Sequence, residues 1–187
     1  RRLGVSASIR RLELGGYRRG NRQEIARLAR FAALREEAAM RGAQWVALGH
    51  NANDQAETVL MRAMRGTGLQ GLAAMRVRTI EAAAMGAAGS TAEEGRGSLA
   101  WLRPLLAVTR VEIEAYLQEQ ALMPLRDPTN ASDAYLRNRL RHAVFPLLER
   151  ENPRVVQALC RLADNCAEEH DALEEVGREA SQRSRQH

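Results

Sequence analysis

The sequence predicts an α/β fold in which a partial parallel sheet is followed by a helical segment. Short apolar runs that are typical of buried strands occur at residues 8–14 and 44–48. Between them lies a helical pattern that opens with the capping-box spacing Asn21-x-x-Glu24 and stops near Gly42. A strand, a helix and a second strand at this spacing form a βαβ unit, so we expect parallel strands joined by a right-handed crossover.

The composition favours a polyanionic partner. The 187 residues carry a net charge of +5, and all 28 basic residues are arginine, whose guanidinium group can bind phosphate through several donors. Codon usage is the favoured explanation of the arginine excess itself. The sequence contains no run of about 18 apolar residues, which argues against a membrane span, and no leader pattern that marks secretion. We therefore expect a cytoplasmic protein in which Cys160 and Cys166 are reduced.

The stretch GHNANDQAETVLMR, residues 49–62, follows the second expected strand. Asp54-x-x-Glu57 has capping-box spacing, and Gly66 is expected to end the helix. The apolar residues of one helical face are Ala56, Val59, Leu60, Ala63 and Met64. Ligands of open α/β sheets bind where parallel strands end, and a helix N-terminus suits a phosphate. His50 can then contact a phosphate oxygen while Asp54 or Glu57 holds Mg²⁺ through water. From spacing alone, the favoured alternative is that these are capping and turn residues.

The middle of the chain is expected to contain loops, one strand and one helix. A glycine-rich loop is predicted at residues 66–72 and a flexible insertion at 79–98. A short apolar strand then ends at Arg103. The spacing Thr109-x-x-Glu112 predicts a capped helix. Its inward side chains are expected to be Ile113, Tyr116 and Leu117.

The C-terminal third is expected to be helical. Pro124 should stop the preceding helix, turn chemistry follows at residues 126–130, and Ser132 should begin a new helix. Its apolar side consists of Leu136, Leu140, Ala143, Val144 and Leu147. Pro153 is expected at the first position of a last long helix, and the tail from residue 178 should fray. The apolar residues of that helix are Leu159, Leu162, Cys166, Leu173 and Val176.

A basic cluster, YLRNRLRH, occupies residues 135–142. Arg137 and Arg141 lie four residues apart on one helical face, so they can contact adjacent phosphates. Arg139 points elsewhere, and His142 adds a donor that titrates. A solvated helix face is an equally good interpretation of these residues.

Four stretches together resemble the tRNA(Ile)-lysidine synthetase family in order and spacing. They are LGHNANDQAETVLMRAMRGTGLQGLAAM, WLRPLL, RDPTNASDAYLRNRLRH and FPLLERENP, and residues 26–31 resemble the family's upstream helix. The resemblance covers nearly the whole chain outside residues 79–98. It implies the adenine nucleotide alpha hydrolase-like fold of N-type ATP pyrophosphatases. Residues 1–125 would form an incomplete domain of this kind, and residues 126–187 a helical segment leading toward C-terminal tRNA-binding domains.

The resemblance also implies a reaction. The family uses ATP to adenylate the wobble cytidine of tRNA(Ile) with a CAU anticodon, and free L-lysine then displaces AMP to leave lysidine. By resemblance, ATP and Mg²⁺ are the cofactors, and a homodimer is an open alternative to a monomer. The residues that fall on the family's motifs are His50, Asp54, Glu57 and Arg103 for catalysis; His50, Arg103 and Arg139 for ATP; Asp54 for metal; and Arg65, Arg137, Asn138 and Arg141 for tRNA.

The sequence departs from the family pattern in two respects. Asn51 and Asn53 stand where many relatives have a histidine and an aspartate, so Asp54 would carry more of any metal binding. The family's SGGxDS phosphate loop does not occur in these residues. We therefore expect an incomplete fragment that is inactive by itself.

Two other functions fit parts of the sequence. A 2-thiocytidine synthetase would share the fold, but Cys160 and Cys166 have the wrong number and spacing for its iron–sulfur cluster. A noncatalytic helical RNA-binding module would have no need of the retained GHNANDQAET and WLRPLL stretches.

Overall fold

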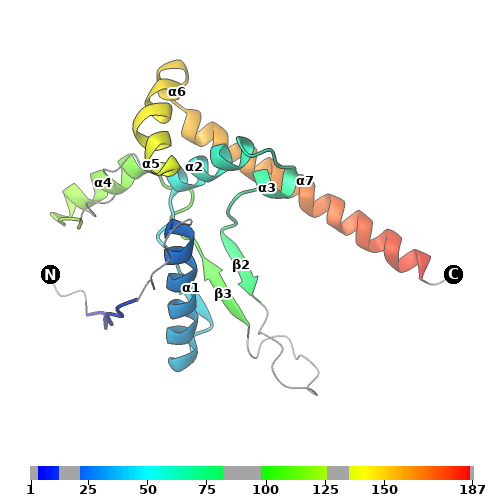
Figure 1. Ribbon diagram of the computed structural model, residues 1–187, viewed down its shortest axis with the longest axis horizontal. Coiled ribbons are helices and arrows are strands. Elements are labelled where there is room, and N and C mark those ends of the chain that lie inside the picture. Colours follow the sequence, from blue (N-terminus) through cyan, green and yellow to red (C-terminus); the bar gives the residue numbers. More distant parts are fainter. Residues whose placement is uncertain (1–3, 13–21, 82–97, 126–134, 186–187) are drawn as a thin grey trace. The chain divides into compact units, whose positions relative to one another are not determined.

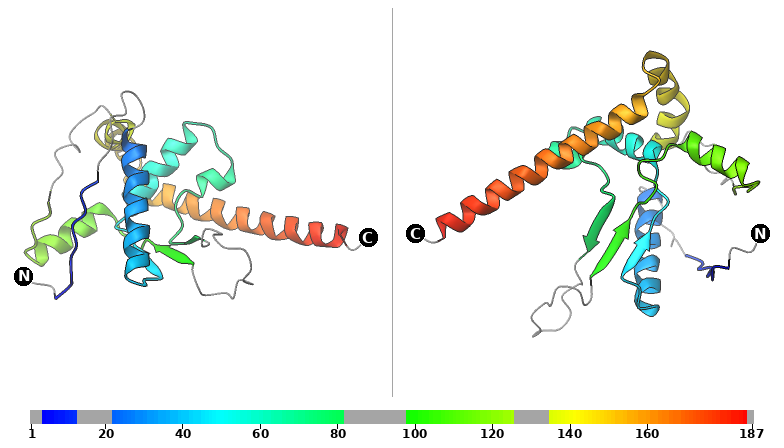
Figure 2. Two further views of the ribbon diagram at one scale, coloured as in Figure 1. Left: turned by 60° about the horizontal axis from the view of Figure 1, so that its bottom comes forward. Right: turned by 180° about the vertical axis from the view of Figure 1, so that it is seen from behind.

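A computed structural model describes residues 4–12, 22–81, 98–125 and 135–185 (Figures 1 and 2). The chain divides into two compact units. The sheet unit comprises Arg1–Ala47 and Thr79–Leu102, and the helical unit comprises Leu48–Arg78 and Arg103–His187.

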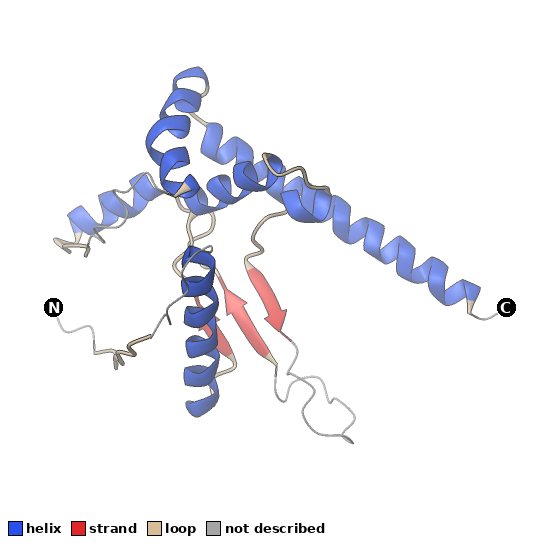
Figure 3. Cartoon of the chain, viewed as in Figure 1, coloured by secondary structure: helices blue, strands red, loops and turns tan. Residues whose placement is uncertain are grey.

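The sheet unit contains three short strands and one long helix (Figure 3). Helix α1 spans Arg22–Met40, and strands β1, β2 and β3 span Trp45–Ala47, Arg78–Glu81 and Leu99–Leu102. The strand order is β1-β3-β2, and β1 runs parallel to β3 with Val46 opposite Trp101. Helix α1 packs on this sheet through Phe31, whose ring centroid lies 4.8 Å from that of Trp101. A parallel pair is therefore present, but it joins β1 to β3 and not β1 to the strand expected at residues 8–14, so the expected βαβ unit is not formed by the described residues.

Three expectations for the sheet unit are corrected. Residues 8–12 of the expected first strand form no strand, because they are exposed and their polar side chains bind α1 instead; Ser8 donates to Glu37, and residues 13–14 lie outside the described part. Strand β1 is at the expected place but is not buried, since Trp45 is 52% exposed. Strand β2 occupies the start of the expected insertion, whose residues 82–97 also lie outside the described part.

The helical unit is built around the first half of a long helix. Its elements are α2 (Ala52–Ala63), α3 (Leu69–Leu72), α4 (Arg110–Glu119), α5 (Leu136–Arg139), the π-helix η2 (Leu140–Val144), α6 (Phe145–Glu151) and α7 (Val155–Ser184). One core cluster is formed by Ala52 and Ala56 of α2, Leu140 and Phe145 of the α5–α6 segment, and Val156 of α7. Short helix α3 packs its leucines near Cys166 of α7 in a second cluster. No helix among the described residues is both long enough and apolar enough to span a bilayer.

Leu136, Leu140 and Val144 lie in or against the core as expected, and the π-helix explains why the other two residues of the predicted apolar side do not. A π-turn inserts one residue into the helical repeat, so inward positions after it move along by one. Leu140 is buried as expected, but the next core residue is Phe145, while Ala143 and Leu147 are exposed. The described part of this helix begins at Leu136, and the expected start at Ser132 lies outside it.

Three helix boundaries and one side-chain position also differ from the sequence prediction. The loop expected at residues 66–72 contains α3, and helix α7 begins at Val155 rather than at Pro153. Helix α7 stays regular through Ser184, where fraying was expected. Tyr116 of α4 is exposed rather than inward. The Thr109–Glu112 capping box of α4 is confirmed.

Candidate functional site

Helix α2 begins three residues earlier than the Asp54–Glu57 spacing predicts. Asn51 is the N-cap: its Oδ1 accepts the Asp54 N–H at 3.0 Å, and Asp54 Oδ2 accepts the Asn51 N–H at 3.1 Å. Asparagine caps helices about as well as aspartate, so Asn51-x-x-Asp54 is a competent capping box. The prediction that Glu57 completes the box is therefore wrong, and Glu57 is left for a different role.

The N–H groups of Asn51, Ala52 and Asp54 at the start of α2 are bound by the chain itself. The Ala52 N–H donates to the Val108 carbonyl at 2.9 Å, in addition to the capping bonds of Asn51 and Asp54. The Asn53 side chain accepts the Arg110 N–H at 2.8 Å, which ties α2 to the start of α4. A phosphate was expected to bind these donors, but they are already engaged. The positive end of the helix dipole remains. His50 is half-buried in the segment before α2, and its predicted contact with phosphate stays a prediction.

Glu57 lies at the centre of a buried ion cluster, the Glu57 clip, formed with Arg137 and Arg141. Arg141 donates to the carboxylate through both Nε and Nη2, at 2.8 and 3.0 Å. Arg137 Nε lies 3.0 Å from Oε2, and Arg137 Nη2 donates to Thr58 at 3.0 Å. Only 2% of Glu57 is exposed, against 31% and 22% of the two arginine side chains. The clip therefore fastens α2 to the α5–η2 segment.

Burial determines the titration of Glu57. Loss of hydration raises its pKa above the ordinary value, while the charge and hydrogen bonds of Arg141 and the charge of Arg137 oppose the shift. A buried carboxylate with a raised pKa and two cationic partners can hold those cations in fixed positions. Because both its oxygens are engaged, Glu57 is poorly suited to hold a metal ion.

The other predicted metal ligand, Asp54, is also engaged. Its Oδ2 accepts the cap hydrogen bond, and its Oδ1 lies 3.7 Å from Arg141 Nη2. Across the described ranges, no three His, Cys, Asp or Glu side chains are grouped so as to hold a metal ion. The carboxylates described here therefore do not fit a magnesium site without rearrangement.

The remaining predicted tRNA residues, Asn138 and Arg65, and the predicted ATP residue Arg139 differ in exposure. Asn138, which lies between the two clip arginines in the sequence, is buried. Arg139 and Arg65 are exposed. Contact of Asn138 with RNA would need the α5 segment to open. Arg139 and Arg65 can meet a partner as the structure stands.

Arg103, the other predicted catalytic residue, follows β3 and is 8% exposed. Its Nη1 donates to the Arg76 carbonyl at 2.8 Å, and its backbone N–H donates to the Val77 carbonyl at 2.8 Å. A buried guanidinium held by backbone oxygen keeps its full charge in a fixed place. This arrangement suits stabilisation of developing negative charge.

Gln55 and Thr58 are site residues that the sequence reasoning missed. Gln55 is buried and hydrogen-bonds to the backbone of Met75 through both ends of its amide. Thr58 accepts from Arg137 and donates to the Asp54 carbonyl at 2.7 Å. One signal was available: Gln55 lies four residues before Val59, so a polar side chain interrupts the apolar face of α2.

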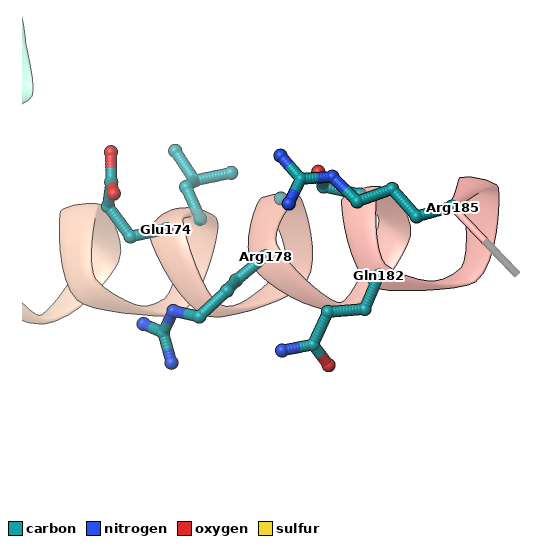
Figure 4. Close-up of a pocket in the computed structure, with 7 residues that line it drawn as sticks. Glu174, Arg178, Gln182 and Arg185 are labelled. Atoms are coloured by element: carbon teal, nitrogen blue, oxygen red, sulfur yellow. The ribbon is translucent and has the colours of Figure 1, made fainter.

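Helix α7 carries both cysteines and, at its far end, a pocket. Burial, reinforced by Asp164, raises the pKa of Cys160 to about 11, and its thiol lies 3.4 Å from the Ala52 carbonyl. Figure 4 shows a pocket along the exposed end of α7. Its lining residues are Leu173, Glu174, Gly177, Arg178, Ser181, Gln182 and Arg185, which include none of the predicted site residues.

Comparisons with known proteins agree with this arrangement of elements. The PP-loop domain family matches residues 1–148. The tRNA(Ile)-lysidine synthases of Geobacillus kaustophilus and Geobacter sulfurreducens are 38% and 40% identical to the chain over 158 and 170 residues. These matches cover 84% and 91% of the chain but 31% and 32% of the relatives, so the chain spans about a third of their length.

A solved structure shows the same fold at low sequence identity. The U34-tRNA thiolase NcsA from Methanococcus maripaludis matches 81% of this chain and 46% of its own with a TM-score of 0.59 and 16% identity. At that identity the likeness concerns the fold alone. With the family match spanning 148 of the 187 residues, this chain belongs to the PP-loop domain family.

Proposed function

We propose that this chain is part of the catalytic core of a tRNA(Ile)-lysidine synthetase, which joins lysine to the wobble cytidine of tRNA(Ile) at the expense of ATP. The observation that carries the proposal is the identity of 38–40% to two such enzymes over 84–91% of the chain. The matched region includes α2, Arg103 and the Glu57 clip. These elements bring guanidinium groups, an imidazole and a buried carboxylate into one unit.

The proposed reaction has two balanced steps. The 2-carbonyl oxygen of the cytidine attacks the α-phosphorus of ATP. An O–P bond forms, which links C2 of the base to AMP through oxygen, and pyrophosphate leaves. The ε-amine of lysine then forms a bond to C2, loses its proton, and AMP leaves with the oxygen. Both steps develop negative charge on phosphate oxygens, which preorganised cations stabilise.

The residues of this chain have distinct proposed roles in those steps. His50, Arg103 and Arg139 have the donor chemistry that triphosphate requires, and Arg103 is already fixed by backbone carbonyl contacts. Asp54 stays the proposed metal ligand, but its engagement in the α2 cap does not fit that role as it stands, so no step is assigned to a metal ion.

Arg137 and Arg141 are proposed to contact tRNA phosphates while Glu57 holds them in register. Glu57 contacts nitrogens along one edge of each guanidinium, and part of each arginine side chain remains exposed. Fixing both arginines beforehand lowers the entropic cost of phosphate binding. Arg65 would add an exposed contact outside the clip.

The test is a product assay on the full-length enzyme. The protein is incubated with ATP, Mg²⁺, L-lysine and tRNA(Ile) bearing a CAU anticodon. The tRNA is then digested, and its nucleosides are identified by mass spectrometry. The expected product is lysidine, with AMP and pyrophosphate released in equal amounts. A parallel reaction replaces lysine with a sulfur donor. Formation of 2-thiocytidine, or binding of tRNA without turnover, would contradict the proposal.

The tRNA contacts are tested by the salt dependence of binding. Arg137→Met should lower the slope of log affinity against log salt by about one unit, because one phosphate contact is lost. Arg150→Met removes an exposed arginine of α6 that has no proposed role, and serves as the matched control. Equal changes in the two variants would mean that only overall charge is measured. Circular dichroism confirms that both variants are folded.

A further inference from the structure

The segment between α3 and β2 is held largely by side chains, together with one backbone hydrogen bond from Arg103. It leaves α3 through Ala74, whose φ of 50° lies in the left-handed region. Arg62 Nη1 caps the end of α3 by donating to the Gly71 carbonyl at 2.8 Å and the Ala74 carbonyl at 3.3 Å. The three residues that follow, 75–77, are the ones that meet Gln55 and Arg103.

Gln55 pairs with Met75 as a neighbouring strand would. Its Nε2–H donates to the Met75 carbonyl at 2.9 Å, and its Oε1 accepts the Met75 N–H at 3.0 Å. Gln55 is 2% exposed and lies in the first turn and a half of α2. Both backbone groups of Met75 are thus satisfied by one side chain whose own position is fixed by burial.

Arg103 grips the same segment one and two residues further on. Its guanidinium binds the Arg76 carbonyl and its backbone N–H binds the Val77 carbonyl, both at 2.8 Å. The place of the Arg103 guanidinium is therefore set by where residues 75–77 lie. Gln55 is the side chain that fixes the first of those residues to α2.

We propose that Gln55 is a positioning residue for Arg103, acting through the backbone of residues 75–77. This inference rests on the proposed function, because it assigns Gln55 to the adenylation step in which Arg103 takes part. It assigns Gln55 no contact with substrate. It explains why a polar side chain occupies the apolar face of α2.

A second anchor of the same segment supplies a matched control. The Arg76 side chain binds Asp171 of α7 through both carboxylate oxygens, at 2.8 and 2.9 Å. This pair is exposed on both sides, so solvent and salt weaken it. Asp171→Asn removes the charge and one acceptor of this outer anchor, keeps the hydrogen bond from Arg76 Nη2 to the Ala167 carbonyl at 3.2 Å, and leaves the Gln55 pairing intact.

The kinetic test is a double-mutant cycle in the full-length enzyme. Gln55→Met keeps the volume but removes both hydrogen bonds, and a displaced Arg103 should lower kcat for AMP release about tenfold to a hundredfold. The KM for tRNA should change less than about twofold, because Gln55 and Arg103 are proposed to act together on the adenylation step and not on tRNA binding. Gln55→Met should add less than about twofold to the loss caused by Arg103→Met. Asp171→Asn should leave kcat unchanged.

Three results would overturn the inference. The first is a double variant whose loss of kcat equals the product of the losses of Gln55→Met and Arg103→Met. The second is an effect of Gln55→Met on the KM for tRNA alone. The third is full activity of Arg103→Met. If Gln55→Met does not fold, Gln55→Glu replaces it, since a carboxylate keeps the acceptor for the Met75 N–H but repels the Met75 carbonyl.

Amide hydrogen exchange tests the inference without using activity. In Gln55→Met, the Met75 and Arg103 amides should both exchange at least about tenfold faster, while Asp171→Asn leaves both near the parent rate. An unchanged Arg103 amide would overturn the link between Gln55 and Arg103. A parent enzyme that makes no lysidine would instead contradict the proposed function, and the exchange result would still decide the inference.

Discussion

The two units use arginine–glutamate pairs in opposite ways. In the helical unit, Glu57 is almost fully buried between Arg137 and Arg141. In the sheet unit, Glu81 is 40% exposed; it accepts two hydrogen bonds from Arg35 and one from Trp101. The contacts are of similar length, at 2.8–3.0 Å in both places. The two carboxylates differ in how much hydration they lose on folding.

That difference reverses the direction of the pKa shift. The hydrogen bonds from Arg35 lower the pKa of Glu81, whereas loss of hydration raises the pKa of Glu57 despite two cations. Arginine partners therefore stabilise the ionised form at the surface, and in the clip they only partly offset the cost of burial. The sequence shows the same residue types in both places, so contact chemistry alone does not decide what a pair contributes.

The largest effect should come from removing one partner of the buried pair. Arg141→Met leaves the Glu57 carboxylate without its two-point donor, and should destabilise the protein by about 3–5 kcal/mol at pH 7. Urea unfolding measures the change. The double variant Glu57→Met with Arg141→Met removes both charges and should recover most of the loss. A double variant as unstable as the single one would show that packing, rather than charge, is responsible.

The same variant has a defined pH dependence. Because the folded pKa of Glu57 is raised above 4.5, its contribution to stability is present below that value and is lost as the pH rises through the folded pKa. Arg141→Met raises the folded pKa further. The destabilisation should therefore shrink as the pH falls from 7 toward 5, and a constant difference across that range would contradict the burial argument.

The next largest effect tests burial without charge. Leu140 is 1% exposed and Leu147 is 59% exposed, although the sequence pattern places both on one apolar side. Leu140→Ala should cost about 2–5 kcal/mol through lost contacts and a cavity. Leu147→Ala should cost under about 0.5 kcal/mol, as for other surface positions. Equal costs from urea unfolding would show that the π-turn of η2 does not shift the register.

Local patterns predicted much of the fold. The Thr109–Glu112 box, the strand before Arg103 and the helix before Gly42 depend on residues a few positions apart. The start of α2 was ambiguous because Asn51-x-x-Asp54 and Asp54-x-x-Glu57 have the same spacing. The structure places the cap at Asn51 and buries Glu57 against Arg141, which is 84 positions away in the sequence.

The candidate site shows the same limit. Glu57 and Arg103 were named as site residues, but their partners, Arg141 and Arg76, come from distant segments. The pairing of Gln55 with Met75 joins residues 20 positions apart through a turn that needs left-handed Ala74. No periodicity indicates such a turn, since glycine is the usual residue there.

A smaller effect is expected at the α2 cap. Asn51→Ala removes the acceptor for the Asp54 N–H and should cost about 1 kcal/mol of stability. Asp54→Asn keeps an acceptor for the Asn51 N–H and should cost less, near 0.3–1 kcal/mol from the lost charge at the helix N-terminus. Both are measured by thermal unfolding. If Asp54→Asn also keeps full lysidine formation in the full-length enzyme, Asp54 is a capping residue alone.

The smallest effect is expected at the exposed pair of the sheet unit. Glu81→Gln keeps one acceptor, for Trp101, and loses the charge and the second acceptor facing Arg35, so it should cost about 0.2–1 kcal/mol at low salt. The folded pKa of Glu81 is lowered, so its contribution is present above 4.5 and is lost as the pH falls through the folded pKa. The cost of the substitution should therefore vanish in acid and also in 1 M salt, where the Debye length is about 3 Å. Arg141→Met should resist the same salt because its affected carboxylate is buried. Equal salt sensitivity in urea unfolding of the two variants would mean that water reaches Glu57, and the contrast between the units would then fail.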